Sequence, residues 1–268
     1  MQRRILIIDD HNDLAEALFE VFSHLGHEVK VVESRRDAIR IDDIRQYDLT
    51  ITDLEVENNP EPNLNGNRQV CLPTDLMVPP GERIKAFKIC AVNFKRDGFD
   101  EEELKSLVAT VLDYKIRHVD NREAVKDLRE SIEFELPSAI SLMHIVLDYL
   151  MKRVEKLGVV KAEQSNLFVA LDEAFVNAIK HGNKFDVQKR VRIAAEVSRT
   201  EARFTIEDEG EGFDVDSIPD PLDPNNLFKT SGRGVLFIYN IMDEVKYNDR
   251  GNRLTMIKKA AENSDQKS

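Results

Sequence analysis

Three polar side chains recur every four residues within the stretch from Leu167 to Asn183, which reads LFVALDEAFVNAIKHGN. They are Glu173, Asn177 and His181. In a helix this spacing places all three on one face. A carboxylate that can accept a proton, a carboxamide and an imidazole would then face the same way. A solvated polar face has the same pattern, so this helix alone leaves both interpretations open.

Apolar residues in the same stretch predict the helix that would position these groups. Phe168, Leu171, Phe175 and Ala178 recur at steps of three and four. That rhythm is typical of an amphipathic helix whose apolar stripe is buried. The polar face would then be the exposed one.

Two glycine-rich segments further along the chain favour a binding site. Asp208 to Gly212, reading DEGEG, follows a strand-like run, and Ser231 to Gly234, reading SGRG, opens an apolar helical run. Glycine lets a backbone approach a ligand closely, and a helix N-terminus attracts phosphate. A single Gly-x-Gly is a weak signal, but the ordered set of Glu-x-x-x-Asn, Asp-x-Gly-x-Gly and Gly-x-Gly is a strong one.

This ordered set resembles the ATPase fold shared by histidine kinases and gyrase B, the Bergerat or GHKL type. Two further stretches, SGRGVLFIYNIMDEVKY and FELPSAISLMHIVLDYLMKRVEKLG, resemble the anti-sigma-factor serine kinases within that group. The resemblance covers about Ile132 to Lys259. It implies a C-terminal α/β sandwich that binds ATP with Mg²⁺.

The resemblance also implies a role for each residue. Glu173 would be the catalytic general base, and Asn177 would bind the Mg²⁺ that accompanies ATP. Asp208 would accept a hydrogen bond from the adenine amine. The implied nucleotide-binding set is Asn177, Asp208, Gly210, Gly212, Gly232, Arg233 and Gly234.

A second group of carboxylates lies near the N-terminus. Asp9, Asp10 and Asp53 each follow a strand-like run, in a succession of strand, helix, strand, helix and strand. That succession predicts a parallel sheet, whose carboxyl ends meet at one edge. Three carboxylates gathered there would repel each other unless a cation such as Mg²⁺ bound them.

These residues carry a resemblance to a response-regulator receiver domain, through RILIIDDHNDLAEALFEVFSHLGHEVKVVES and then YDLTITDL. It implies a doubly wound, flavodoxin-like parallel sheet, Mg²⁺ on Asp9, Asp10 and Asp53, and Asp53 as phosphoacceptor. The match ends near Leu54, and the following segment is short enough to suggest a lost helix. The family's remaining polar positions would fall at Thr74 and Lys95. A receiver-shaped domain used only for dimerisation or docking remains an equal alternative.

Length and composition set the domain organisation and exclude some functions. The 268 residues suffice for two domains. We expect a receiver-like domain at 1–112, a helical linker at 113–132, an ATP-binding kinase-like domain at 133–260 and a disordered tail at 261–268. The net charge of −12 argues against a nucleic-acid partner. No apolar run has the roughly 20 residues of a membrane span, and a cytoplasmic location with Cys71 and Cys90 reduced is expected.

The resemblances together imply a receiver-regulated, ATP-dependent serine/threonine kinase. It would phosphorylate a small, STAS-like antagonist protein and bind a sigma factor or an equivalent client, in a partner-switching pathway. An upstream histidine kinase and a homodimer are further expectations. Two alternatives stay open: an ATP-binding docking or anti-sigma module without significant kinase activity, and autophosphorylation with transfer to Asp53. His144 is not followed by an acidic residue, which argues against a histidine kinase.

Overall fold

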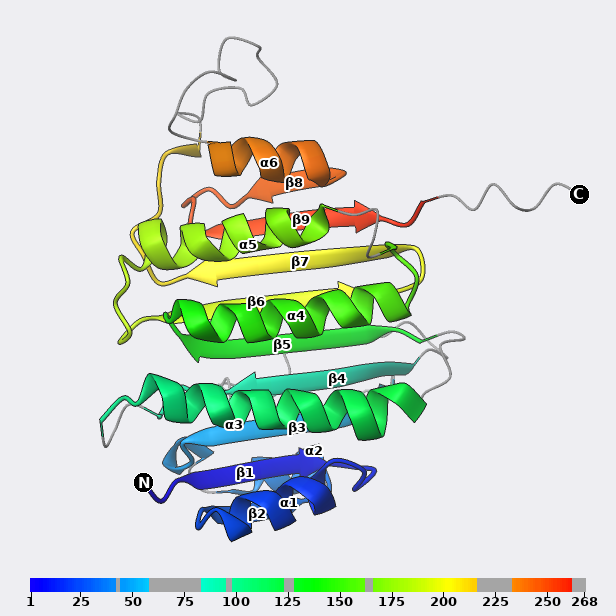
Figure 1. The fold of residues 1–268 in the computed structure, drawn as a ribbon, viewed down its shortest axis with the longest axis vertical. Coiled ribbons are helices and arrows are strands. Elements are labelled where there is room, and N and C mark those ends of the chain that lie inside the picture. Colours follow the sequence, from blue (N-terminus) through cyan, green and yellow to red (C-terminus); the bar gives the residue numbers. More distant parts are fainter. Residues whose placement is uncertain are drawn as a thin grey trace, which may run out of the picture. The chain divides into compact units, whose positions relative to one another are not determined.

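The computed structural model describes residues 1–41, 44–57, 83–94, 98–122, 128–161, 166–215 and 233–261. The chain divides into two compact units, Met1–Pro137 and Ser138–Ser268, whose elements are labelled in Figure 1. Several sequence expectations lie outside the described residues, namely those on Thr74, Lys95, Gly232 and residues 262–268.

The first unit contains a five-stranded sheet in the order β2-β1-β3-β4-β5. Its strands are β1 (Arg4–Asp9), β2 (Glu28–Val32), β3 (Leu49–Glu57), β4 (Arg83–Cys90) and β5 (Glu130–Pro137). Its helices are α1 (Ala15–His24), α2 (Arg35–Ile39) and α3 (Glu101–Tyr114). Short 3-10 turns occupy Ile44–Gln46 and Asp120–Arg122, and a π-helical turn occupies Lys115–Val119.

Strand directions in this sheet depart from the expected doubly wound parallel arrangement. β1 pairs in parallel with β2 and β3, as predicted. β4, however, is antiparallel to β3 and parallel to β5. Antiparallel neighbours need no crossover helix, which agrees with the short segment after Leu54. The all-parallel prediction is therefore wrong beyond β3, because apolar patterning does not reveal the direction in which a strand runs.

Helix α3 forms where its sequence predicts. Asp100 caps it by accepting a hydrogen bond from the Glu103 amide at 3.0 Å. Its apolar stripe is buried, and comprises Leu104, Leu107, Val108, Val111 and Leu112. The chain then continues through the π-helical turn, in which Lys115 and Val119 are buried. With β5 paired to β4, the first unit extends to Pro137.

The second unit contains an antiparallel sheet in the order β6-β7-β9-β8. Its strands are β6 (Arg190–Val197), β7 (Glu201–Asp208), β8 (Glu244–Tyr247) and β9 (Arg253–Lys259). Its helices are α4 (Ile140–Lys156), α5 (Leu167–Asn177) and α6 (Arg233–Ile241). Figure 1 shows the three helices over the same face of this sheet. This arrangement fits the expected α/β sandwich.

Buried positions alternate with less buried ones along β6 and β7, which explains why a layer of helices packs on one face of this sheet. Every second residue of each strand is buried, and β6 contributes Val191, Ile193, Ala195 and Val197. Helix α5 buries Leu167, Ala170, Leu171, Ala174 and Phe175. Phe168, which was predicted to belong to that stripe, is 40% exposed, because the buried face runs through Leu167 and Ala174 instead.

Candidate functional site

Helix α5 presents Glu173 and Asn177 one turn apart, as their spacing predicts. Both side chains are half-buried. Within the described part of the chain, neither makes a hydrogen bond or an ion pair. A carboxylate and a carboxamide without protein partners on one helix face are available to a ligand.

His181 lies in the π-helical turn Ala178–Gly182 that follows Asn177. Its side chain is exposed. A role for His181 beside Glu173 and Asn177 stays a prediction.

The first turn of α6 lies directly against Glu173. A Cβ atom added to Gly234 would overlap Oε2 of Glu173 and would lie 3.1 Å from its Cδ. Glycine at this position therefore permits the close approach of the two helices. The structure thus brings the Glu-x-x-x-Asn helix together with the end of the second glycine-rich segment. Arg233 begins α6, and its side chain lies outside the described residues.

Asp208, the last residue of β7, lies in a tight space made by two glycines. Its Oδ1 accepts a hydrogen bond from the Gly210 amide at 2.8 Å. A Cβ on Gly182 would overlap the Asp208 carboxylate, and a Cβ on Gly210 would overlap the Gly182 carbonyl oxygen. Burial raises the pKa of Asp208 above its usual value. The Gly210 amide and the lack of space beside Gly182 therefore hold this carboxylate in one position.

Gly212 is required by backbone geometry. Its φ angle is +80°, a region that other residues rarely adopt, and a Cβ there would overlap the Arg250 carbonyl oxygen. The Phe213 amide donates to that same oxygen at 3.2 Å. The Asp-x-Gly-x-Gly segment thus packs against the turn between β8 and β9.

Sequence reasoning missed two buried asparagines beside Asp208. Asn183 is fully buried, and its Oδ1 accepts a hydrogen bond from the Glu209 amide at 2.8 Å. Asn252 is 7% exposed, and its Nδ2 donates to the Asp208 carbonyl oxygen at 2.8 Å. Patterns of spacing cannot reveal them, because their partners are backbone groups that only the fold brings near.

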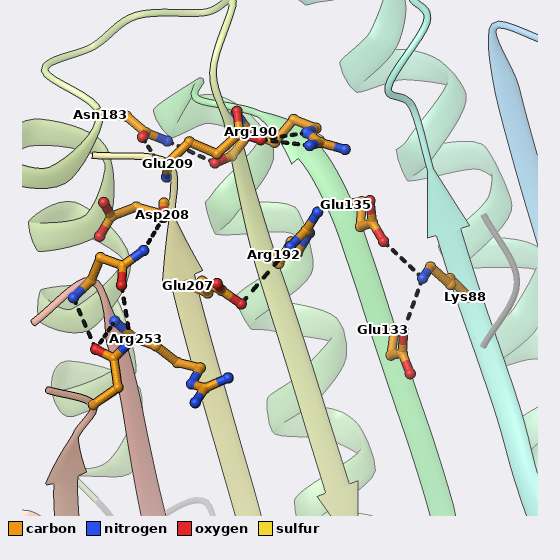
Figure 2. Close-up of polar contacts among 12 residues, drawn as sticks. Lys88, Glu133, Glu135, Asn183, Arg190, Arg192, Glu207, Asp208, Glu209 and Arg253 are labelled. Atoms are coloured by element: carbon orange, nitrogen blue, oxygen red, sulfur yellow. Dashed lines mark hydrogen bonds and ion pairs between the residues drawn. The ribbon is translucent and has the colours of Figure 1, made fainter. Parts of the chain in front are cut away.

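An ion pair flanks the same segment. The Arg190 guanidinium donates to Oε1 of Glu209 through Nε at 2.8 Å and Nη2 at 2.6 Å, as Figure 2 shows. Partial burial raises the pKa of Glu209, but the hydrogen bonds from Arg190 outweigh this and leave the pKa below its usual value. The pair holds the start of β6 against the end of β7.

In the first unit, Asp9 is occupied by its own loop. Its Oδ1 accepts from the His11 and Asn12 amides at 3.0 and 3.1 Å, and its Oδ2 accepts from the Leu14 and Ala15 amides at 2.9 and 2.8 Å. The side chain is almost fully buried. Asp9 therefore organises the turn into α1.

Asp53 is paired with a lysine. Both of its oxygens accept from the Lys115 ammonium, at 3.1 and 2.8 Å, and Lys115 also lies 3.2 Å from Asp120. Burial raises the pKa of Asp53 to about 6, Lys115 opposes that rise, and the carboxylates of Asp9 and Asp120 add to it. Asp53 lies within β3 rather than at its end.

The Mg²⁺ site expected at Asp9, Asp10 and Asp53 stays a prediction, and these carboxylates have other partners in the structure. Within the described residues, no group of three acidic, histidine or cysteine side chains could hold a metal ion. One oxygen of Asp10 accepts from the Glu55 amide at 2.9 Å. Asp9 and Asp10 thus accept hydrogen bonds from backbone amides, and Asp53 is paired with the Lys115 ammonium. Among the described residues, Lys115 supplies the cation beside Asp53, and the expectation on Lys95 lies outside them.

The state of Cys90 differs from the reduced thiol expected from the sequence. Cys90 ends β4 and is buried. It is disulfide-bonded, so the prediction of a reduced thiol is wrong for this residue. The spacing of the two cysteines could not show this pairing.

Comparisons with known proteins find similarity in the C-terminal half of the chain. The histidine kinase-like ATPase domain matches residues 136–258. The serine-protein kinase RsbW of Staphylococcus epidermidis is 27% identical over 145 residues, which cover 50% of this chain and 89% of the relative. RsbW of Bacillus subtilis strain 168 is 28% identical over 128 residues, which cover 46% and 80%. The C-terminal half is similar to a kinase-like ATPase of the GHKL type.

The lengths and the hydropathy of the described helices can be compared with those of a membrane span. None of these helices is both long enough and apolar enough to cross a bilayer. The longest, α4, has 17 residues, and its buried face includes Arg153. It is an amphipathic helix that packs within the second unit.

Proposed function

We propose that the protein is an ATP- and Mg²⁺-dependent serine/threonine protein kinase of the anti-sigma-factor type. The observation that carries the proposal is Glu173, a half-buried carboxylate without a hydrogen bond or ion pair in the described residues, packed against Gly234 in the first turn of α6. Asn177 lies one turn further along the same helix. The similarity to kinases named RsbW supports the same activity.

Each residue has a task that its surroundings permit. Asp208 would accept a hydrogen bond from the adenine amine, with Gly210 and Gly212 allowing the base to lie close. The Asn177 amide oxygen, which lacks a protein partner, would hold Mg²⁺, and the metal would neutralise charge on the triphosphate. Glu173 would take the proton from a serine or threonine hydroxyl as that oxygen attacks the γ-phosphorus. The segment Gly232 to Gly234 would contact the phosphates.

The substrate in this proposal is a small, STAS-like antagonist protein. The kinase would also bind a sigma factor or an equivalent client, so that phosphorylation of the antagonist would switch which partner is bound. The net charge of −12 agrees with protein partners rather than nucleic acid. A cytoplasmic location and a homodimer belong to the same proposal.

We further propose that the first unit regulates the kinase through Asp53, as the receiver resemblance implies. The Lys115–Asp53 pair gives this residue a defined resting state. An acyl phosphate, or a phosphohistidine on an upstream kinase, would transfer its phosphoryl group to an Asp53 oxygen. Treating the protein with acetyl phosphate and measuring its mass tests this. Addition of one phosphoryl group, lost in Asp53→Asn, supports it, and an unchanged mass contradicts it.

The activity itself is tested by incubating the full chain with labelled ATP, Mg²⁺ and candidate antagonist proteins. We expect label on the antagonist, at a serine or threonine identified by mass spectrometry. Partners recovered with and without ATP should differ if phosphorylation switches them. Tight nucleotide binding without transfer to any antagonist would instead show an ATP-dependent docking module.

A further inference from the structure

Two buried carboxamides hydrogen-bond the backbone around Asp208 from opposite sides. One belongs to Asn183, just beyond the turn that ends α5, and the other to Asn252, just before β9. We infer that both are positioning residues that hold Asp208 ready to bind the adenine amine. The inference rests on the proposed nucleotide site and deepens it, because it concerns how that site recognises its base.

The Asn183 side chain is fully committed to this task. Its Oδ1 accepts from the Glu209 amide at 2.8 Å, a contact that Figure 2 shows. Its Nδ2 donates to Ser138 Oγ at 2.7 Å and to the Arg190 carbonyl oxygen at 2.8 Å. An amide N–H can only donate and a carbonyl oxygen can only accept, so these partners permit one orientation of the carboxamide.

Asn252 holds the other side through two hydrogen bonds of opposite direction. Its side-chain Nδ2 donates to the backbone carbonyl oxygen of Asp208 at 2.8 Å, and its backbone carbonyl oxygen accepts from the Asp208 amide at 3.0 Å. Asn248 orients this side chain, because its Nδ2 donates to Asn252 Oδ1 at 3.0 Å. Asn248 also accepts from the Asn252 amide at 3.1 Å.

These bonds fix the backbone from Asp208 to Gly210. Asn252 holds the amide and carbonyl of Asp208, Asn183 holds the amide of Glu209, and Oδ1 of Asp208 holds the amide of Gly210. Gly182 limits the room left to the carboxylate itself. A group ordered before the ligand arrives does not spend binding free energy on ordering.

The two asparagines contact the backbone at or next to the proposed base-binding residue, and not the proposed general base. Both act at Asp208, whereas Glu173 lies against Gly234 on α6. Loss of either carboxamide should therefore weaken recognition of the base and leave the rate at saturating ATP nearly unchanged. A merely structural contribution would lower the amount of folded protein without changing which base is preferred.

The test compares ADP with IDP by calorimetry on the full chain, because inosine has a carbonyl where adenine has its amine. Wild type should bind ADP more tightly than IDP. In Asn183→Ala and Asn252→Ala, ADP affinity should fall by about tenfold, the scale of one hydrogen bond to a charged group. IDP affinity should fall much less. Asn248→Ala should show a smaller change, and the exposed Asn240→Ala should show none.

Two results would overturn the inference in different ways. Folded Asn183→Ala and Asn252→Ala proteins with the wild-type ratio of ADP to IDP affinity would show that the carboxamides do not position Asp208, while the nucleotide site would stand. Failure of wild type to bind either nucleotide would remove the proposed function itself, and this inference with it.

A measurement on wild type alone covers the case in which the variants do not fold. Hydrogen exchange of the Glu209 and Gly210 amides should be slow without nucleotide and should change little when ADP is added. Fast exchange without nucleotide that becomes slow with ADP would show that the ligand orders this segment, which would overturn the inference.

Discussion

The two carboxylate sites of this protein differ in what their acidic groups are bonded to. In the first unit, four backbone amides surround Asp9, and the Lys115 ammonium occupies both oxygens of Asp53. In the second unit, Glu173 has no hydrogen bond or ion pair within the described residues. We call the first site closed, because its carboxylates are bonded to groups of the same chain. We call the second site open, because Glu173 remains available to a ligand.

This difference teaches that acidic residues at expected positions do not by themselves make a binding site. Carboxylate oxygens that already accept hydrogen bonds from amides or from an ammonium group are less available to a ligand. A carboxylate without such partners keeps its capacity to bind or to accept a proton. Variants that remove a partner from the first site, or remove the open group from the second, test this contrast directly.

The largest effect should come from the open site. Glu173→Gln should lower phosphoryl transfer to the antagonist by about 10²- to 10⁴-fold, the usual contribution of a general base. Nucleotide affinity should remain, because the contacts to adenine are elsewhere. Transfer assays and calorimetry measure the two quantities. Asp172→Asn, on the neighbouring residue, is the matched control, and equal loss in both variants would contradict the assignment.

At the closed site, removing the lysine should be costly for stability. Lys115→Met would leave Asp53 and Asp120 buried without their cation, which should lower the free energy of unfolding by about 3–5 kcal/mol. Urea denaturation measures this change. Lys105→Met is the control, since Lys105 is exposed and its pair with Glu102 at 3.5 Å should contribute less than about 1 kcal/mol. Similar values for both variants would show that the buried pair is not what closes this site.

The raised pKa of Asp53 predicts a dependence of stability on pH. With a folded-state pKa of about 6 against an ordinary 3.8, the folded state keeps the proton over an interval in which the unfolded state has released it. The stabilisation that the protonated Asp53 gives to the folded state is therefore fully present below about pH 4, and it is lost as pH rises through 6. The loss is about 3 kcal/mol at this shift.

Asp53→Asn removes this titration and serves as the reference. Unfolding free energies of wild type and variant, measured by urea denaturation from pH 4 to pH 7, should diverge, with wild type losing stability relative to the variant as pH rises. Parallel curves would mean that Asp53 has an ordinary pKa in the folded state.

The smallest of these effects tests the contact between α5 and α6. Gly234→Ala should favour the helix by about 1 kcal/mol through propensity alone. Its Cβ would nevertheless displace the Glu173 carboxylate, and a displacement of about 1 Å can cost about 10²-fold in rate. We expect higher or unchanged thermal stability together with slower transfer. Unchanged transfer would show that the position of Glu173 is not critical.

Much of the second unit could be predicted from its sequence. The amphipathic helix with Glu173 and Asn177, the strand that ends at Asp208 and the close packing of the glycines beside it all form as expected. These features depend on local spacing and on glycine chemistry, which a linear sequence records. Asn183 and Asn252 were missed because their partners are backbone groups distant along the chain.

The first unit was predictable only up to β3. Local patterns predicted the succession from β1 to β3, but the direction of β4 and the pairing of Lys115 with Asp53 depend on contacts between distant residues. The Lys115–Asp53 pair spans 62 positions. No spacing rule reaches across such a separation.

The sequence by itself determined where helices and strands form and which residues could bind a nucleotide, because periodicity and glycine content act over a few neighbouring residues. Only the tertiary structure decided which carboxylates are neutralised by the protein and which stay available. That outcome depends on burial and on partners that folding brings together, and these set the charge and the hydrogen-bonding capacity of each group.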